Sequence, residues 1–183
     1  MSDLITKDLD KNIRGIIFPS LKTNGFQKMK GKTAWGWHDE CIWVFNIKAV
    51  GYSHSMVTNW PSASLTVNLG IYYTYLPHKS ECKKDENGLL CPKEYQCNRR
   101  AELTCSYDQL KYTEHVKCNS SEKKRRDIWW VQPDGSNIIE VVNDINIRYL
   151  DYAVKWFMEK SDKELTLLEA GRLNGFHIEQ IDR

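Results

Sequence analysis

A run of strictly alternating residues over positions 63–75 constrains the fold of this chain more than any other feature. Its odd positions are apolar: Leu65, Val67, Leu69, Ile71 and Tyr73. Its even positions are Thr66, Asn68, Gly70 and Tyr72. Successive side chains of a strand point to opposite faces of a sheet, so this run predicts a strand with one buried and one wetter face. We therefore expect an antiparallel sheet that is covered on one side.

Helices are predicted at both ends of the chain. Apolar residues at helical spacing predict a helix over residues 3–24, which Pro19 is expected to kink or split. A long helix over residues 137–160 is expected to begin with a capping box made by Asn137 and Glu140. Another capping box at residues 161–164 predicts a final helix that ends near residue 173.

Further strands complete the predicted sheet. Residues 26–38 are typical of one strand, or of two pieces around Gly31, and residues 41–50 of a second strand that forms a hairpin with the first. Residues 51–61 are expected to form a loop, and residues 127–132 a short strand. This order predicts an α+β fold with a mostly antiparallel sheet of four to five strands, flanked by an N-terminal helix and two C-terminal helices.

Composition limits the class of protein. The 183 residues suit a single domain, and 41% hydrophobic with 27% charged residues is typical of a soluble globular chain. The net charge of +2 gives no support to nucleic-acid binding, because such proteins usually carry a larger basic excess. No signal segment or membrane-spanning run is visible, so we expect a cytoplasmic protein whose thiols stay reduced.

Five of the six cysteines lie in a polar insertion over about residues 77–121. Within it, residues 94–103 are predicted to form a short helix. The candidate ligands of a structural zinc ion are the thiols of Cys82, Cys91, Cys97 and Cys105. Their spacing lacks the usual C-x-x-C knuckle, so two alternatives stay open. In the first alternative, Cys97 and Cys105 are buried packing residues and the other cysteines are loop thiols. In the second, the protein is exported and forms one or two disulfides.

The chain contains seven tryptophans, which is many for its length. Trp129 and Trp130 are adjacent on a predicted strand and point to opposite faces, so we expect one in the core and the other elsewhere. An exposed tryptophan is a strong interface anchor because it offers a large contact area at a low entropic cost. An interface role for one of the pair is therefore one hypothesis, and a tryptophan-rich core is the alternative.

Motifs of catalysis and phosphate binding are absent from the sequence: it contains no Gly-rich phosphate loop, G-x-S-x-G or H-E-x-x-H. A nucleophile at Cys97 would need a base such as His38 or His115, but no spacing singles out such a pair. Residues 123–126 are four consecutive cations that would suit phosphate or an acidic partner. A solvated loop is the favoured interpretation, because the rest of the chain lacks a matching basic face.

Four motifs occur in a defined order along the chain. They are Phe18-Pro19-Ser20-Leu21 followed by Asn24-Gly25-Phe26, the strand over residues 64–71, Cys97-Asn98-Arg99-Arg100 with Leu103, and Trp129-Trp130. This order resembles the bacterial family called domain of unknown function 4304, over about residues 8–160. The chain departs from the family in its extra thiols (Cys82, Cys91, Cys105 and Cys118) and in a longer connection after Leu76. The family name implies no activity, but small single-domain bacterial proteins of this sort often resemble immunity proteins.

Two functional hypotheses follow. The first is a non-enzymatic immunity or antitoxin-type protein that neutralises a bacterial toxin by contact. Its candidate partner-binding residues are Trp129, Trp130, Tyr72, Tyr73, Arg99 and Arg100. The alternative is a small enzyme or a zinc-stabilised ligand-binding domain that uses the cysteine-rich segment. In that case Arg100 is expected to hold an anionic ligand, because its planar guanidinium matches carboxylate or phosphate.

Overall fold

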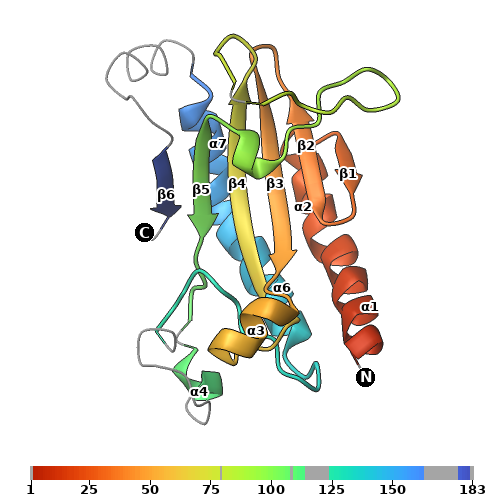
Figure 1. Cartoon of the computed structure of the whole chain (residues 1–183), viewed down its shortest axis with the longest axis vertical. Helices are drawn as coiled ribbons and strands as arrows, with labels where there is room; N and C mark the ends of the chain where they lie inside the picture. Colours follow the sequence, from red (N-terminus) through yellow and green to blue (C-terminus); the bar gives the residue numbers. More distant parts are fainter. Residues whose placement is uncertain (1, 79, 108, 114–123, 163–176, 182–183) are drawn as a thin grey trace.

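The computed structural model describes residues 2–78, 80–107, 109–113, 124–162 and 177–181. These residues form an α+β fold around one sheet of six strands (Figure 1). In spatial order the strands are β1 (Lys28–Lys30), β2 (Thr33–Trp37), β3 (Cys41–Ala49), β4 (Leu65–Tyr73), β5 (Arg99–Leu103) and β6 (His177–Ile181). Neighbours from β1 to β5 run antiparallel, and β6 runs parallel to β5. The predicted fold class and the mostly antiparallel sheet are therefore confirmed.

The N-terminal helix has three pieces: α1 (Ser2–Asn12), the π-helical turn η1 (Ile13–Ile17) and α2 (Phe18–Thr23). Pro19 lies in the first turn of α2, directly after the π-helical turn. Ile17 and Phe18 both keep the right-handed helical conformation, so the chain stays helical through Pro19 and the predicted split is wrong, whereas a kink there stays a prediction. The inward-facing residues are Leu9, Ile13, Ile17 and Leu21.

The C-terminal helix consists of α6 (Ile138–Arg148), the π-helical turn η3 (Tyr149–Ala153) and α7 (Val154–Lys160), as predicted for residues 137–160. The predicted cap at Asn137 is wrong. Its side-chain amide instead donates to the Trp130 carbonyl at 2.8 Å and accepts from the Gln132 N–H at 2.7 Å, so it is not available to the helix. The predicted helix over residues 161–173 falls almost entirely outside the described residues.

Both helices pack on the same face of the sheet and form the main core with it. Phe45 on β3 and Leu69 on β4 lie in this core with Ile13 from the first helix and Phe157 from the second. The ring of Trp43 stacks on that of Phe157, with centroids 4.9 Å apart. The alternation in β3 and β4 therefore places their odd-numbered residues against the helices.

The predicted loop over residues 51–61 contains a short helix, α3 (Tyr52–Thr58), so that prediction is wrong. Gly51 precedes the helix with φ at +80°, a conformation that glycine adopts without steric cost. Asn59 ends it in the left-handed conformation and donates its N–H to the Ser55 carbonyl at 2.8 Å. The helix thus depends on its ends rather than on an apolar repeat.

The predicted helix over residues 94–103 is also wrong. It is a single 3₁₀ turn, η2 (Glu94–Gln96), followed by strand β5. Arg, Ala, Glu and Leu favour helices, but β5 pairs with β4 and points Ala101 and Leu103 into the core. Pairing and burial therefore outweigh the local preference.

The strand predicted over residues 127–132 is reduced to one bridge, between Trp129 and Leu65.

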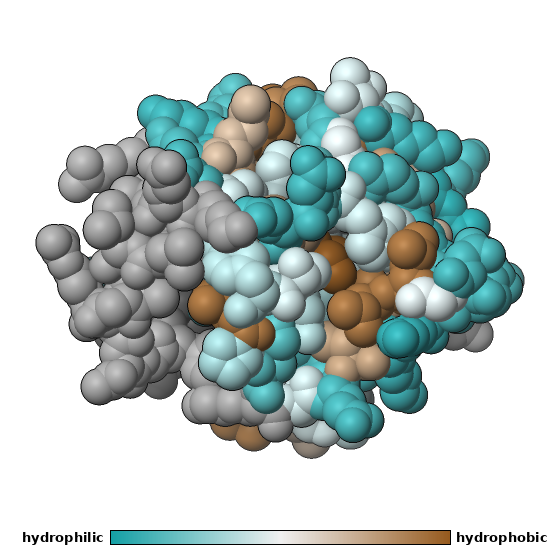
Figure 2. Space-filling view, turned by 90° about the horizontal axis from the view of Figure 1, so that it is seen from above, coloured by the Kyte–Doolittle hydropathy of each residue, from teal (hydrophilic) through white to brown (hydrophobic). Residues whose placement is uncertain are grey.

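The opposite face of the sheet is covered over half its length by the cysteine-bearing segment. Trp35 donates its indole N–H to the Pro92 carbonyl, and Trp37 donates to the Leu90 carbonyl, both at 2.8 Å. Seen from above, the described surface is mostly hydrophilic with separate hydrophobic patches (Figure 2). Among the described residues, no helix is long and apolar enough to cross a membrane.

Candidate binding surface

The remaining half of that second sheet face carries polar side chains, which we call the open polar face. The odd-numbered residues of β3 and β4 face the helices, so their even-numbered residues lie on this second face together with the residues of β2 and β5 that pair with them. The members of the open polar face are Thr33, Asn46, Lys48, Thr66, Asn68, Arg100 and Glu102. All are exposed or half-buried.

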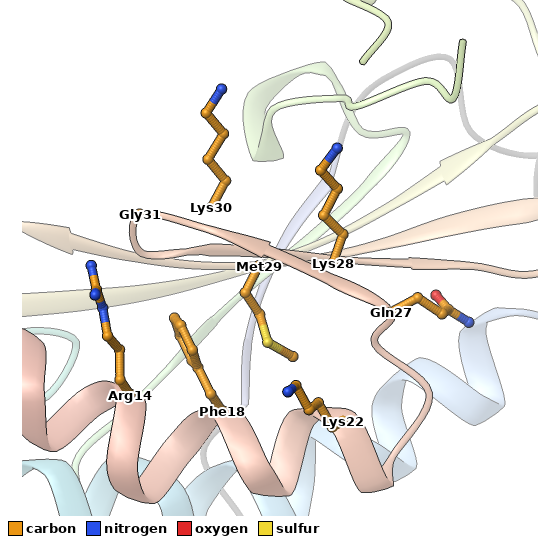
Figure 3. Close-up of a pocket in the computed structure, with 8 residues that line it drawn as sticks. All are labelled: Arg14, Phe18, Lys22, Gln27, Lys28, Met29, Lys30 and Gly31. Carbon is orange, nitrogen blue, oxygen red and sulfur yellow. The ribbon is translucent and has the colours of Figure 1, made fainter. Parts of the chain in front are cut away.

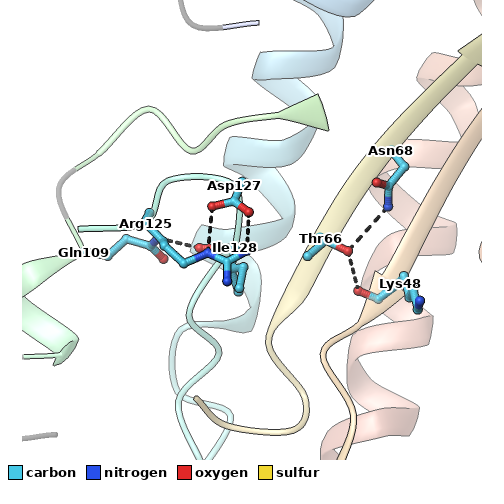
Figure 4. A network of polar contacts seen from close by, with 7 residues as sticks. All are labelled: Lys48, Thr66, Asn68, Gln109, Arg125, Asp127 and Ile128. Carbon is cyan, nitrogen blue, oxygen red and sulfur yellow. Dashed lines mark hydrogen bonds and ion pairs between the residues drawn. The ribbon is translucent and has the colours of Figure 1, made fainter. Parts of the chain in front are cut away.

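Hydrogen bonds between neighbouring strands and within β4 already order several of these side chains. The Asn46 amide donates to the Thr33 hydroxyl at 2.7 Å. The Thr66 hydroxyl donates to the Lys48 carbonyl at 3.4 Å and accepts from the Asn68 amide at 3.5 Å (Figure 4). A surface with side chains held in place before contact loses less conformational entropy when a partner binds.

Charged side chains lie at the β5 end of the open polar face. The Arg125 guanidinium donates two hydrogen bonds to the Asp127 carboxylate, one of them from Nε to Oδ1 at 3.0 Å (Figure 4). Glu102 is near this pair, and burial together with the Asp127 charge raises the pKa of its carboxyl group, whereas Arg100 and Arg125 oppose that rise. A carboxylate kept at a cost to folding is a feature of functional surfaces.

Replacing Glu102 with glutamine is therefore expected to raise the free energy of unfolding near pH 7, by less than about 1 kcal/mol because water still reaches the carboxylate. A carboxyl group with a raised folded-state pKa favours the folded state fully below its unfolded-state pKa, and this contribution is lost as the pH rises through the folded-state pKa. Urea denaturation at about pH 7 and about pH 3.5 measures the difference, which should disappear at the lower pH, where glutamate is protonated. An equal gain at both pH values would contradict the assigned cause.

Helix α3 lies in front of the lower end of β3 and β4, next to the open polar face (Figure 1). It presents three large apolar side chains to solvent: Tyr52 is 73% exposed, Met56 65% and Val57 83%. Tyr52 and Met56 are one turn apart and thus neighbours on the helix surface. Grouped exposed apolar side chains beside ordered polar ones are typical of a protein-binding surface.

The structure buries most of the sequence-predicted partner residues. Trp129 has no exposed surface and lies in the main core, and Trp130 is 4% exposed and packs on Trp60, with ring centroids 5.2 Å apart. The two rings do lie in different clusters, but the expectation of an exposed tryptophan is wrong, because Trp60, with Val50 and Tyr112, covers the second site.

The tyrosines and arginines of the predicted set are also divided. Tyr73 is buried against the helices and donates its hydroxyl to the Lys160 carbonyl at 2.5 Å. Tyr72 is buried beneath the cysteine-bearing segment, and its ring stacks on His78 at 3.6 Å. Arg99 is buried, on the side of the sheet that bears Ala101. Of the six predicted residues, Arg100 is the member on the open polar face, and partner binding by the others stays a prediction.

The four candidate zinc ligands are not brought together. Cys82 and Cys91 pack on the cluster that contains Cys97, whereas Cys105 lies in the main core. Within the part of the chain that the structure describes, no group of three or more His, Cys, Asp or Glu side chains is arranged to hold a metal ion. Zinc binding stays a prediction, and Cys118 lies outside the described residues.

Cys97 and Cys105 are both fully buried, which confirms the packing interpretation for them. A Cβ atom on Gly70 would lie 2.5 Å from the Cys97 sulfur, so the thiol occupies the space that glycine leaves on β4. Burial raises the pKa of Cys97 well above its usual range, which keeps the thiol protonated and weakly nucleophilic. His38, a base considered for Cys97, instead contacts Trp43, with ring centroids 4.0 Å apart.

The basic run at residues 123–126 is partly occupied by contacts within the chain. Arg125 pairs with Asp127, and Arg126 donates to the Cys105 carbonyl at 2.8 Å. Lys124 is exposed, and Lys123 lies outside the described residues. These contacts give two of the four cations a structural role.

Sequence reasoning missed the apolar side chains of α3, since they carry no periodic signal, and it missed Glu102 and Asp127. Glu102 lies on the open polar face because β5 is a strand paired with β4. Since this segment was predicted as a helix, the sequence could not place Glu102 beside Asp127. Alternation in residues 63–75 did predict the wetter face itself, through Thr66 and Asn68.

Comparison with known proteins supports one assignment. The family model described as Domain of unknown function (DUF4304) matches residues 17–159, which include β1 to β5 and nearly all of the C-terminal helix. No curated protein and no solved structure matches the chain. Because the family model covers well over half of the sequence, the chain belongs to the Domain of unknown function (DUF4304) family.

Proposed function

We propose that this chain is a non-enzymatic binding protein of the immunity or antitoxin type, which acts in the cytoplasm and neutralises a toxin by direct contact. The observation that carries the proposal is the apolar side of α3 beside the open polar face. The toxin is expected to cover Tyr52 and Met56 and to place polar groups against the ordered side chains of β3, β4 and β5.

The chemistry of this surface is that of a protein interface. Aromatic and methionine side chains are enriched at the centre of interfaces, where they contribute most of the binding energy, and a polar rim excludes water around them. Arg100 adds a planar donor that matches a carboxylate of the partner. The immunity role rests on analogy between small single-domain proteins, and co-expression with the partner tests it.

Met56→Ala and Tyr52→Ala are each expected to weaken toxin binding by about 2 kcal/mol, which is roughly 30-fold, because these side chains become buried at the interface. The partner is first captured from a lysate of the source cells with the immobilised chain, and its affinity for each variant is then measured by calorimetry. Co-expression of the captured protein with the wild-type chain or a variant tests whether its toxicity is relieved.

Met158 on α7 supplies a matched control, because it is 66% exposed and Met56 is 65% exposed. Met158→Ala should leave both affinity and protection unchanged. Equal effects of the two methionine variants would contradict the assigned surface. A captured partner that is harmless when expressed alone would contradict the immunity role while leaving protein binding intact.

A further inference from the structure

A cleft of about 660 Å³ lies between the N-terminal helix and β1, away from the open polar face. Arg14, Phe18 and Lys22 rise from the helix toward β1, and Met29 points down from the strand between them (Figure 3). Phe18 and Met29 are half-buried and pack on the main core. The cleft thus has an apolar floor with a cation at each end.

All the charged residues that line the cleft are cations. Its lining contains Arg14, Lys22, Lys28 and Lys30 and no acidic residue. Lys28 is paired with Asp85 at 2.6 Å, and both lysines of β1 point away from the helix (Figure 3). The side chains of Arg14 and Lys22 make no hydrogen bond or ion pair with any residue that the structure describes. Two cations without an internal partner favour an anionic ligand at each end.

The two sides of the cleft have the same length. Arg14, Phe18 and Lys22 are spaced four residues apart, and eight residues of helix rise about 12 Å. Residues 27–31 along β1 span about 13 Å in extended conformation. Arg14 lies below Gly31, and Lys22 lies below the other end of the strand (Figure 3). A ligand that runs parallel to β1 therefore meets both cations.

β1 is at the edge of the sheet and, among the described strands, pairs with β2 alone. The outer edge of such a strand presents backbone N–H and C=O groups that can pair with another extended chain. Peptides bind proteins in this way by adding a strand to a sheet edge. The backbone edge favours a peptide over a nucleic acid, which would use the cations but not the strand.

We propose that this cleft binds an extended acidic peptide segment of a partner protein, which adds as a strand to the outer edge of β1. Acidic residues at positions i and i+4 of the peptide meet Arg14 and Lys22, and an apolar residue at i+2 packs on Phe18 and Met29. Side chains at i, i+2 and i+4 of a strand share one face, which gives the motif acid, any, apolar, any, acid. This site goes beyond the proposed function, because it lies outside the open polar face and α3.

The test uses a fluorescein-labelled synthetic peptide with the core Glu-Thr-Val-Thr-Glu and the full chain, with fluorescence anisotropy as the readout. The double variant Arg14→Gln/Lys22→Gln is expected to bind about tenfold more weakly or worse, and a Gln-Thr-Val-Thr-Gln peptide should lose the same amount. Lys155→Gln is the control for loss of a cation outside the cleft: it removes one positive charge, where the double variant removes two, from a site on α7 where the side chain is 76% exposed. It should bind the acidic peptide like the wild type.

Two peptides N-methylated on alternate backbone amides test the added strand. One of them should lose binding, and the other should keep it, because only every second amide of an added strand faces β1. Failure of the wild-type chain to bind the acidic peptide, equal binding by the double variant, or equal binding of the two methylated peptides would each overturn the proposal. Displacement of the peptide by oligothymidine, with tighter binding of the oligonucleotide, would assign the cleft to nucleic acid instead.

Discussion

Replacing Trp129 with alanine is expected to lower the free energy of unfolding by about 4 kcal/mol, because the change leaves a large cavity in the main core. The ring has no exposed surface, and its indole N–H donates to the Asp144 carboxylate at 2.7 Å. The backbone of Trp129 exchanges two hydrogen bonds with Leu65, at 2.8 and 3.0 Å, so the ring is held at the end of β4. Urea denaturation of the variant and the wild type measures the loss.

Tyr95→Ala is the control for an aromatic side chain removed from the surface, since Tyr95 is 56% exposed. It should change the free energy of unfolding by less than about 0.5 kcal/mol. An unchanged stability of Trp129→Ala would contradict the core assignment and restore the hypothesis that this tryptophan contacts a partner. The two roles make opposite predictions, because an interface residue affects affinity without affecting stability.

The tryptophan pair shows what strand alternation can and cannot predict. The period of two correctly separated Trp129 and Trp130 into different clusters. It could not reveal that both sides are covered, because the cover of Trp130 comes from Trp60, Val50 and Tyr112, which lie elsewhere in the chain. Periodicity reports which residues share a face, whereas burial depends on what packs against that face.

Long elements were predictable because many residues repeat the same signal. The helices over residues 2–23 and 138–160 and strand β4 each bury one side along most of their length, and their patterns are visible in the sequence. Strand β5 has five residues, all of which favour helices, and its strand conformation comes from pairing with β4. Arg100 and Glu102 were therefore not assigned to the sheet.

The cysteines could not be grouped from their spacing, because spacing does not show which face of a sheet a residue occupies. Cys97 comes before β5 and packs on Gly70, whereas Cys105 follows the strand and enters the main core. Only eight residues separate them, but the sheet lies between their environments. Four thiols close in sequence thus serve two different clusters.

Replacing Asp144 with alanine is expected to lower the free energy of unfolding by about 3 kcal/mol, because three donors would lose their acceptor in a buried site. Asp144 is 6% exposed on α6. Its carboxylate accepts hydrogen bonds from the Ser106 N–H at 3.1 Å, from the Ser106 hydroxyl and from the Trp129 indole N–H. It thereby ties the chain after β5 and the chain around Trp129 to the C-terminal helix. Urea denaturation measures the loss, and Asp151→Ala, on the exposed side of the same helix, is the matched control.

A double-mutant cycle between Asp144→Ala and Trp129→Phe separates the shared hydrogen bond from the other effects of each change. Phenylalanine keeps an aromatic ring in the cavity but lacks the indole N–H, so the two losses should overlap by about 1 kcal/mol. Additive losses would show that the Trp129–Asp144 bond contributes nothing of its own and that Asp144 acts through Ser106 alone. A full overlap would instead make the indole the main partner. Either way the cycle measures how strongly the buried carboxylate couples the C-terminal helix to Trp129, a contact that no periodic pattern in the sequence predicts.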